Sequence, residues 1–311
     1  MMSFEKRMKM FQRTIARYGL YFTSWLIKRM PYKAIRVVSD IFIAIGFRLT
    51  NNQRKIAKES LRLAFGKEKG PSEIDQIVRK CFENVGRGMI EMLYFMSHPS
   101  LVAQKVSFDG KEHLKEALKK GRGVIAVTAH FGNFPLMMMH LALEGYKTNA
   151  IIRPARDQEL ESYLFKKRTE TGLKTIYAVP RQQCVMSSLA ALRNNEVLFI
   201  PLDQNFGSNG GIFVDFFGHK AATATGPVVF ARRTKAPILP MFIIRLKEDT
   251  HKIIIEPPLS LEEVNDEEAF IVLNTEKITK LIEHYIRLYP HEWGWMHKRW
   301  KSQPSFKTNR Q

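Results

Sequence analysis

The sequence predicts an α/β fold, with a largely parallel central sheet flanked by helices and an N-terminal helical segment that associates with a membrane. From residue 104 onwards, short apolar runs rich in β-branched residues alternate with amphipathic stretches, which is the pattern of a parallel sheet covered by helices. Residues 51–103 place apolar side chains at three- and four-residue spacing, which is typical of helices. The first 50 residues join short apolar stretches to ten basic and two acidic residues, a composition that suits a membrane surface.

We expect a basic amphipathic membrane-associating segment at residues 1–50 and a single α/β domain at residues 51–311. That domain begins with a helical lead-in at 51–103, and its core spans 104–302. A chain of 311 residues is long enough for one large core or two modest ones. Because the sequence contains no internal repeat, low-complexity tract or flexible linker, the helical lead-in is predicted to be part of one unit.

The N-terminal segment has two apolar stretches, residues 18–27 and 41–47, with aromatic side chains and basic flanks. Helices of this kind lie in the headgroup layer of a bilayer, where each basic residue near anionic lipid contributes roughly 1 kcal/mol. The alternative is an amphipathic layer packed on the core, and we favour membrane attachment. No apolar run reaches the length of about 18 residues that a spanning helix needs, and the N-terminal residues lack the pattern of a cleavable signal peptide.

The net charge of +19 indicates anionic partners, and a membrane surface, nucleic acid or an acidic carrier protein would each fit. The two cysteines, Cys81 and Cys184, form no Cys-x-x-Cys pair and no clustered Cys/His spacing. We therefore expect reduced thiols in a protein that faces the cytosol, and no metal site.

The predicted elements follow the alternating pattern in chain order. Helices are expected at residues 51–65, 72–96, 112–120, 134–144, 157–171, 181–194, 225–234 and most of 261–289. Strands are expected at residues 106–108, 124–129, 147–152, 196–202, 238–246 and 251–256. Most of these strands are short and nearly continuously apolar, as strands buried on both faces are.

His130 directly follows the predicted strand at 124–129. Asn133 can cap the next helix, and Pro135 fits the first turn of that helix, where a missing N–H costs little. His130 is thereby placed at the carboxyl end of a strand, which is the edge where open α/β sheets bind their ligands. A structural histidine in a turn is the alternative.

Asp203 follows the apolar strand at 196–202, so we expect it at the same edge of the sheet as His130. A carboxylate there can accept the imidazole N–H, fix the tautomer and raise the basicity of the ring. The alternative is an aspartate that caps a turn. We predict that Asp203 orients His130.

Three further groups have functional and structural interpretations. Arg153, after the strand at 147–152, can hold a phosphate or form a surface salt bridge. Thr225 and Gly226 begin a helix whose N-terminus suits a phosphate or a developing oxyanion, or is a plain helix start. Residues 289–301 interleave aromatic and basic side chains, which suits a membrane interface or stacking on single-stranded nucleic acid.

Four blocks in this order resemble the lipid A biosynthesis late (lauroyl/myristoyl-type) acyltransferase family, within the lysophospholipid/glycerolipid acyltransferase superfamily. They are His130-Phe-Gly-Asn133, Arg153-Pro154, the Phe216-Phe-Gly218 turn with Thr225-Gly-Pro227, and an ending that holds Trp295, His297, Arg299 and Trp300. The segment 82–91 also resembles a helix that precedes the family's core. One position departs from the His-x4-Asp/Glu motif of the superfamily, because its acidic residue is Pro135 here.

The resemblance implies a membrane-associated acyltransferase on the cytoplasmic face of the bacterial inner membrane, peripheral or monotopic. It would move a fatty acyl chain from acyl-carrier protein or acyl-CoA to a hydroxyl of a lipid A precursor, lysophospholipid or glycolipid. His130 would be the general base, and no cofactor is expected besides the acyl donor. The absence of a Gly-x-Ser-x-Gly elbow favours direct transfer. We expect Asp203 to be catalytic with His130, and the substrate-binding residues to be Asn133, Arg153, Gln204, Phe217, Gly218, Thr225, Gly226, His297 and Arg299.

Two other functions remain open from the sequence. A catalytically silent lipid-binding homologue is indicated by Pro135, and a nucleic-acid-binding protein by the net charge and the Trp-rich ending. The second is disfavoured, because many basic residues lie beside the apolar N-terminal stretches. Membrane lipids and the acyl donor are therefore the expected partners, with no nucleic acid, and the sequence sets no oligomeric state.

Overall fold

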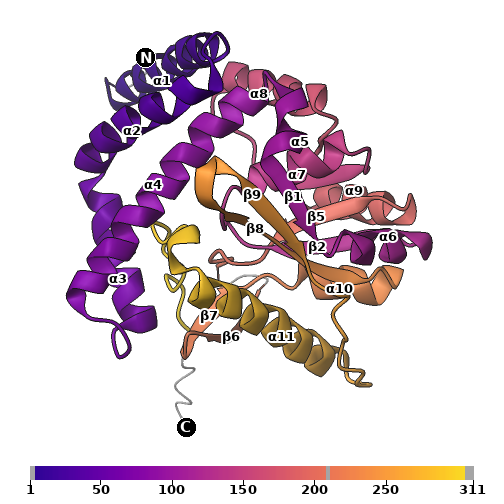
Figure 1. The fold of residues 1–311 in the computed structure, drawn as a ribbon. Helices are drawn as coiled ribbons and strands as arrows, with labels where there is room; N and C mark the ends of the chain where they lie inside the picture. The colour runs from indigo at the N-terminus through magenta and orange to yellow at the C-terminus, as the bar shows by residue number, and fades with distance from the viewer. Residues whose placement is uncertain (1–3, 208–210, 305–311) are drawn as a thin grey trace.

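The computed structural model describes residues 4–207 and 211–304, and its centre is a seven-stranded sheet in the order β1-β9-β8-β2-β5-β3-β4 (Figure 1). The predicted N-terminal segment begins at residue 1 and the predicted α/β domain ends at residue 311, and both of these bounds lie outside the described ranges. Neighbouring strands are parallel, apart from the antiparallel pair β8–β9. The strands are β1 Val106–Asp109, β2 Val124–Thr128, β3 Thr148–Ile152, β4 Lys174–Tyr177, β5 Val197–Pro201, β8 Ile238–Arg245 and β9 His251–Ile255.

Helices cover both faces of this sheet. Since successive side chains of a strand point to opposite faces, Ile125 and Val127 of β2 pack with α9, α10 and α11, whereas Val124 and Ala126 pack with α6 and α7. The longer helices are α1 Phe4–Ile27, α2 Tyr32–Leu49, α3 Asn51–Phe65, α4 Pro71–Phe95, α6 Lys111–Lys119, α7 Phe134–Leu143, α8 Gln158–Glu170, α9 Arg181–Arg193, α10 Gly226–Thr234 and α11 Glu267–Leu288; α5 is the short Val102–Lys105.

The predicted α/β class and largely parallel sheet are confirmed, with three differences in the elements. The strand β4 was not predicted, and the helix expected from residue 261 begins only at Glu267. The sequence also missed a separate antiparallel hairpin, β6 Ile212–Phe216 and β7 His219–Thr223. Its two-residue loop, Phe217-Gly218, has positive φ angles of 54° and 72°, the geometry of a type I′ turn. A phenylalanine in the first loop position gives no such signal in the sequence.

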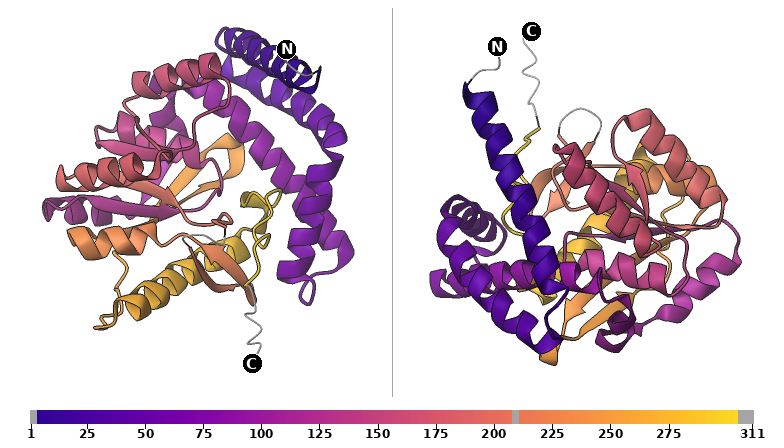
Figure 2. Two further views of the ribbon diagram at one scale, coloured as in Figure 1. Left: turned by 180° about the vertical axis from the view of Figure 1, so that it is seen from behind. Right: turned by 90° about the horizontal axis from the view of Figure 1, so that it is seen from above.

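The N-terminal helices α1 to α4 form a layer along one side of the α/β core, as the views in Figures 1 and 2 show. Helix α2 packs against α4 through the buried Ile35 and Ser39. Helix α1 reaches α8, where the Arg17 guanidinium lies 3.0 Å from the Asp157 carboxylate. Among the described residues, no helix has both the length and the hydropathy that crossing a bilayer requires.

The C-terminal segment after α11 closes on the carboxyl edge of the sheet. A 3-10 turn at Pro290–Glu292 leads to Trp293, which pairs with Phe131 in an isolated antiparallel bridge. Glu292 is only 4% exposed, and its Oε1 accepts a hydrogen bond from the Arg245 backbone N–H at 3.1 Å. Burial raises the pKa of the Glu292 carboxyl to about 7, although the Arg245 N–H and charge act in the opposite direction.

We predict that Glu292→Gln stabilises the protein at alkaline pH. Because the folded chain binds the Glu292 proton more tightly than the unfolded chain, the contribution of Glu292 to the free energy of unfolding falls as pH rises from about 4.5 to about 7. Glutamine retains the carbonyl oxygen but carries no charge, so its stability gain over wild type should grow by about 2 kcal/mol between pH 5 and pH 8. Urea unfolding of both proteins at pH 5 and pH 8 measures this difference in stability.

Glu263→Gln is the matched control, because Glu263 is exposed. A Glu292→Gln protein that differs from wild type by the same amount at both pH values would contradict the assigned burial penalty.

Candidate active site

The pairing of two neighbouring strands brings His130 and Asp203 together. In the parallel pair β2–β5, Thr128 lies opposite Pro201, and His130 and Asp203 each come two residues later. The same register carried past the strand ends sets the two residues side by side at the carboxyl edge. His130 Nδ1 lies 2.9 Å from Asp203 Oδ1.

The contact fixes the tautomer of the imidazole. A carboxylate only accepts hydrogen bonds, so Nδ1 carries the proton and Nε2 of the neutral ring keeps its lone pair. The His130 side chain is 31% exposed and that of Asp203 is fully buried. The ring nitrogen that would act as a base therefore belongs to the one member of the pair that solvent or substrate can reach.

The two groups shift each other's pKa. Burial favours the neutral form of His130, but the charge of Asp203 and its hydrogen bond outweigh burial, so the pKa of His130 lies above its usual 6.5. Burial likewise acts to raise the pKa of Asp203, and the opposing attraction and hydrogen bond of His130, with smaller contributions from His297 and Trp293, hold that pKa far below its usual range. Asp203 is ionised wherever the fold is intact near neutral pH.

The second carboxylate oxygen of Asp203 is bound by a residue that the sequence analysis did not single out. Trp293 is fully buried, and its indole Nε1–H donates to Asp203 Oδ2 at 2.8 Å. Both oxygens of the carboxylate are thus occupied by N–H donors, which offsets its removal from water. The Trp-rich ending marked this segment in the sequence, but no spacing there indicates which tryptophan meets the aspartate.

The turn from His130 to Asn133 is held by the chain's own backbone. The Gly132 N–H donates to the Glu292 carbonyl at 2.8 Å, and the Gly294 N–H donates to the His130 carbonyl at 3.2 Å. Gly132 has φ +55°, and a Cβ there would lie 2.0 Å from the Ile243 carbonyl oxygen of β8. The close neighbour of this turn is β8, so glycine is required there for packing.

Asn133 is almost fully buried and begins α7, as predicted. Its Oδ1 accepts the Leu136 N–H at 3.3 Å, and its amide Nδ2 donates to the Glu91 carboxylate at 3.3 Å. In this structure the Asn133 side chain is therefore engaged within the protein.

His297 and Arg299, in the C-terminal segment, contact the backbone of the loop after β5 that carries Asp203. One ring nitrogen of His297 faces the Gly294 carbonyl at 2.6 Å and the other faces the Asp203 carbonyl at 3.2 Å. Because burial lowers the pKa of His297, the ring is neutral and only one nitrogen donates; the shorter contact is the better hydrogen bond.

Arg299 is fully buried, and it donates to the Gln204 carbonyl at 3.0 Å and to the Ala222 carbonyl at 2.6 Å. It also donates to Thr223 Oγ1 at 2.5 Å. The guanidinium thus ties the loop after β5 to β7 from the inside.

Arg153 and Gln204 are exposed at the same edge of the sheet as His130 and Asp203. Arg153 directly follows β3, the neighbour of β5 in the sheet, and Gln204 directly follows Asp203. A substrate-binding role for Arg153 and Gln204 therefore stays a prediction.

The other predicted residues lie in the hairpin and at α10. Phe217 is buried with its ring 5.1 Å from that of Phe65, its N–H donates to Glu283 at 2.7 Å, and Gly218 completes the turn. Thr225 precedes Gly226 at the start of α10 and makes no side-chain cap. Thr225 also lines an open depression of about 400 Å³ with Gly211, Ile212, Glu267, Glu268 and Ile271. Neither His130 nor Asp203 lines that depression.

The arrangement offers a partly exposed base, backed by a buried carboxylate, for removing a proton from a substrate. In the part of the chain that the structure describes, no three His, Cys, Asp or Glu side chains are grouped to hold a metal ion. The chemistry available from these side chains is general base catalysis.

Comparison with known proteins identifies the family of the chain. The chain is 27% identical over 285 residues to the lipid A biosynthesis lauroyltransferase of Escherichia coli K12, covering 90% of this chain and 89% of that protein. It is 25% identical over 228 residues to the phosphatidylinositol mannoside acyltransferase of Mycobacterium tuberculosis (strain CDC 1551 / Oshkosh), covering 71% and 70%. The profile described as "Bacterial lipid A biosynthesis acyltransferase" matches residues 1–302. Since the match spans almost the whole chain, the chain belongs to the bacterial lipid A biosynthesis acyltransferase family.

Proposed function

We propose that this O-acyltransferase moves a fatty acyl chain from an acyl thioester to a hydroxyl of a membrane lipid, with His130 as the general base. The observation that carries the proposal is the 2.9 Å contact of His130 Nδ1 with Asp203 Oδ1, beside a partly exposed ring. This contact supports a base whose protonated form is stabilised by the ionised carboxylate. The acidic position of the His-x4-Asp/Glu motif is Pro135 here, and in our proposal Asp203 supplies the missing carboxylate.

In the proposed step, His130 Nε2 takes the proton of the lipid hydroxyl as the hydroxyl oxygen attacks the thioester carbonyl carbon. A C–O bond forms and the carbonyl π pair moves onto oxygen. When this oxyanion collapses, the C–S bond breaks and the imidazolium returns its proton to the leaving thiolate, giving an ester and a free thiol. Base catalysis of this kind contributes about 10²–10⁴-fold, and no acyl-enzyme is required.

The Asn205 backbone N–H is our candidate donor to that oxyanion. Arg299, which is buried, holds the Gln204 carbonyl at 3.0 Å, and in a trans peptide the following N–H points the opposite way. The Asn205 N–H is therefore directed away from the buried guanidinium, and it has no acceptor within residues 4–207 and 211–304. Arg153 is a second candidate, through its exposed cationic side chain.

The relatives favour a lipid A precursor as the acceptor, with a lysophospholipid or a glycolipid next, because both a lipid A lauroyltransferase and a phosphatidylinositol mannoside acyltransferase are similar to the chain. The acyl donor is acyl-carrier protein or acyl-CoA, and the net charge of +19 suits the acidic surface of the former and the phosphates of the latter.

The exposed faces of α1 and α2 support attachment at the cytoplasmic face of the inner membrane. On α1, large apolar side chains that are 52–63% exposed recur at helical spacing, so they share one face. They are Phe11, Ile15, Tyr18, Phe22 and Trp25. A second such face on α2 holds Val37, Ile41, Phe42, Ile45 and Leu49. The buried residues of both helices pack on the protein, so these helices would lie on the bilayer and keep their contacts with α4 and α8.

A catalytically silent lipid-binding homologue is the second candidate, favoured by the Pro135 that stands at the start of α7. Purified protein that binds lipid but transfers no labelled acyl group, with either donor and with mixed lipid acceptors, would favour it.

We predict that His130→Ala lowers acyl transfer about 10²–10⁴-fold, because the general base is removed. Asp203→Asn should lower it at least about tenfold, since the imidazolium loses its charge partner. The measurement is transfer of a labelled acyl chain from acyl-carrier protein or acyl-CoA to lipid, normalised to folded protein by circular dichroism.

Asp215→Asn is the control, because Asp215 lies exposed on β6. Near-normal transfer by folded His130→Ala protein would remove His130 from the mechanism.

The pH profile should report the Asp203 contact. A base acts in its neutral form, so kcat/KM should rise with pH through the pKa of His130, which is above 6.5 in the wild type. In Asp203→Asn the attraction is lost while burial remains, so the acidic limb should move to lower pH as the rate falls. An acidic limb at the same pH in both proteins argues that another group is being titrated.

Membrane binding should depend on the exposed face of α1. In sedimentation with vesicles of phosphatidylglycerol and phosphatidylethanolamine, Phe11→Ser/Phe22→Ser should weaken binding roughly tenfold or more, because two exposed aromatic side chains no longer enter the bilayer. Leu273→Ser/Leu288→Ser, two exposed residues of α11, should leave binding unchanged. Equal losses in the two double variants would count against α1 as the attachment face.

A further inference from the structure

We propose that Glu91 is a positioning residue for the catalytic turn: through Asn133 and Arg245 it holds the segment from His130 to Asn133 in its active geometry. The proposal rests on the proposed acyl transfer for its kinetic test, and it has a second test that needs no activity. Glu91 lies on α4, is 3% exposed, and is 39 residues away from His130 along the chain.

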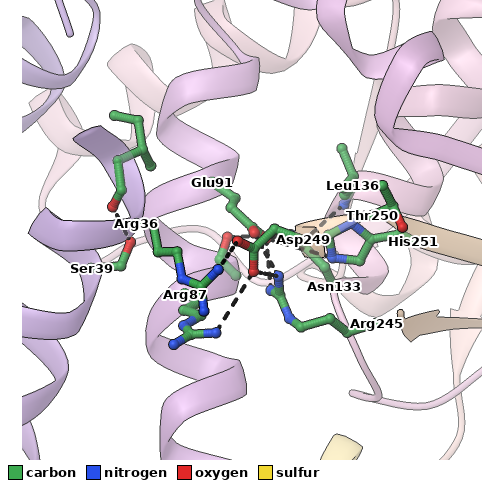
Figure 3. Close-up of polar contacts among 12 residues, drawn as sticks. Arg36, Ser39, Arg87, Glu91, Asn133, Leu136, Arg245, Asp249, Thr250 and His251 are labelled. Atoms are coloured by element: carbon green, nitrogen blue, oxygen red, sulfur yellow. Dashed lines mark hydrogen bonds and ion pairs between the residues drawn. The ribbon is translucent and has the colours of Figure 1, made fainter. Parts of the chain in front are cut away.

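The first tie is a buried ion pair that fixes the Glu91 carboxylate. Arg245, the last residue of β8, donates from Nη1 to Oε1 at 2.6 Å and from Nη2 to Oε2 at 2.7 Å (Figure 3). This two-point contact sets the plane of the carboxylate as well as its place. The side chains of Arg245 and Glu91 are only 10% and 5% exposed, so solvent cannot easily replace either partner.

The second tie runs from this carboxylate to the catalytic turn. Glu91 Oε2 accepts the Asn133 amide N–H at 3.3 Å. Because the amide NH₂ faces an acceptor, its oxygen faces the other way, toward the Leu136 N–H that it caps at 3.3 Å. The Gly88 carbonyl, one turn earlier on α4, accepts from the same amide nitrogen at 3.4 Å. Glu91 and Gly88 together select which end of the amide meets α7, and Asn133 ends the turn that His130 begins.

A third tie reaches the same turn from the other partner of the ion pair. The Arg245 backbone N–H donates to Glu292 Oε1 at 3.1 Å, and the Glu292 carbonyl accepts the Gly132 N–H at 2.8 Å. Gly132 and Asn133 are therefore both connected to the Glu91–Arg245 pair, by separate routes. A displacement of the Glu91–Arg245 pair would therefore shift Gly132 and Asn133, and with them His130 at the start of the same turn.

The charges around Glu91 make this arrangement specific to a carboxylate. His251 Nε2 lies 3.5 Å from Glu91 Oε2, but burial and the charges of Arg245 and Lys105 lower the pKa of His251 to about 3, so its ring is neutral. Arg245 is therefore the cation that balances Glu91. Asp249 accepts a further, longer contact from Arg245 at 3.6 Å and also faces Arg87 at 3.7 Å, on the side of α2 (Figure 3).

The test is a role exchange between Glu91 and Asn133. Glu91→Gln removes the charge that pairs with Arg245 and leaves one acceptor oxygen for both Arg245 and the Asn133 amide. Asn133→Asp sets two carboxylates against each other while keeping an oxygen to cap α7. The double variant Glu91→Gln/Asn133→Asp restores one amide and one carboxylate with their places exchanged. Glu83→Gln is the control, because Glu83 is a partly exposed residue of the same helix whose carboxylate pairs with Arg79 and not with Asn133 or Arg245.

We expect each single variant to lower kcat about tenfold to 10²-fold with little change in KM, because a displaced base costs rate while lipid binding is kept. The double variant should recover part of the lost kcat, because an amide again donates to a carboxylate although the two-point contact with Arg245 stays incomplete, and independent structural defects do not give such a coupling. Unchanged kcat per folded molecule in Glu91→Gln, or a double variant no better than the poorer single one, would overturn the proposal.

The activity-free test is proton NMR of the Nδ1–H that Asp203 accepts from His130. That downfield resonance should shift or broaden in Glu91→Gln, return in the double variant, and stay unchanged in Glu83→Gln. Wild-type protein that transfers no acyl group but gives this pattern would refute the proposed function and leave the positioning role standing. A resonance identical in Glu91→Gln and wild type refutes the positioning role whatever the activity.

Discussion

The contact between the buried Asp203 carboxylate and the His130 imidazole is the interaction on which the rest of the site depends. A carboxylate removed from water is strongly unfavourable unless hydrogen bonds and an opposite charge offset the lost hydration. Here Trp293 supplies one hydrogen bond at 2.8 Å and His130 supplies the other at 2.9 Å. In the proposed mechanism the His130 imidazole gains a proton, and its positive charge then also stabilises the Asp203 carboxylate. Burial removes the Asp203 carboxylate from water, so the carboxylate interacts strongly with a protonated His130 and favours that form of the ring.

The C-terminal segment completes this environment, and that explains why its aromatic and basic residues are inside. Trp293, Trp295 and Arg299 are fully buried, so this part of the segment is neither a membrane-interface anchor nor a platform for stacking nucleic-acid bases, as the sequence had allowed. Trp293 binds Asp203, and Arg299 braces the loop that carries Asp203. The exposed apolar residues that suit a lipid surface are instead gathered on α1 and α2, at the other end of the chain.

Much of the fold and the central pair could be predicted from the sequence, because both follow from local patterns. The strand before His130 and the strand before Asp203 are short apolar runs, and adjacent parallel strands must deliver their following residues to one edge. The hairpin β6–β7 was missed because Phe217 adopts a positive φ without the usual asparagine or glycine. Glu91, Arg245 and Trp293 could not be assigned, since they meet the turn from elements that are 39 to 163 residues away in the sequence, and no local spacing records such contacts.

The most direct test of the account is the titration of the His130 side chain by nitrogen-15 NMR, in wild type and in Asp203→Asn. We expect a wild-type ring that is protonated on Nδ1 when neutral and titrates above pH 6.5, and a variant ring that titrates at a lower pH. A wild-type ring protonated on Nε2, or one whose titration does not change when the carboxylate becomes an amide, would contradict it.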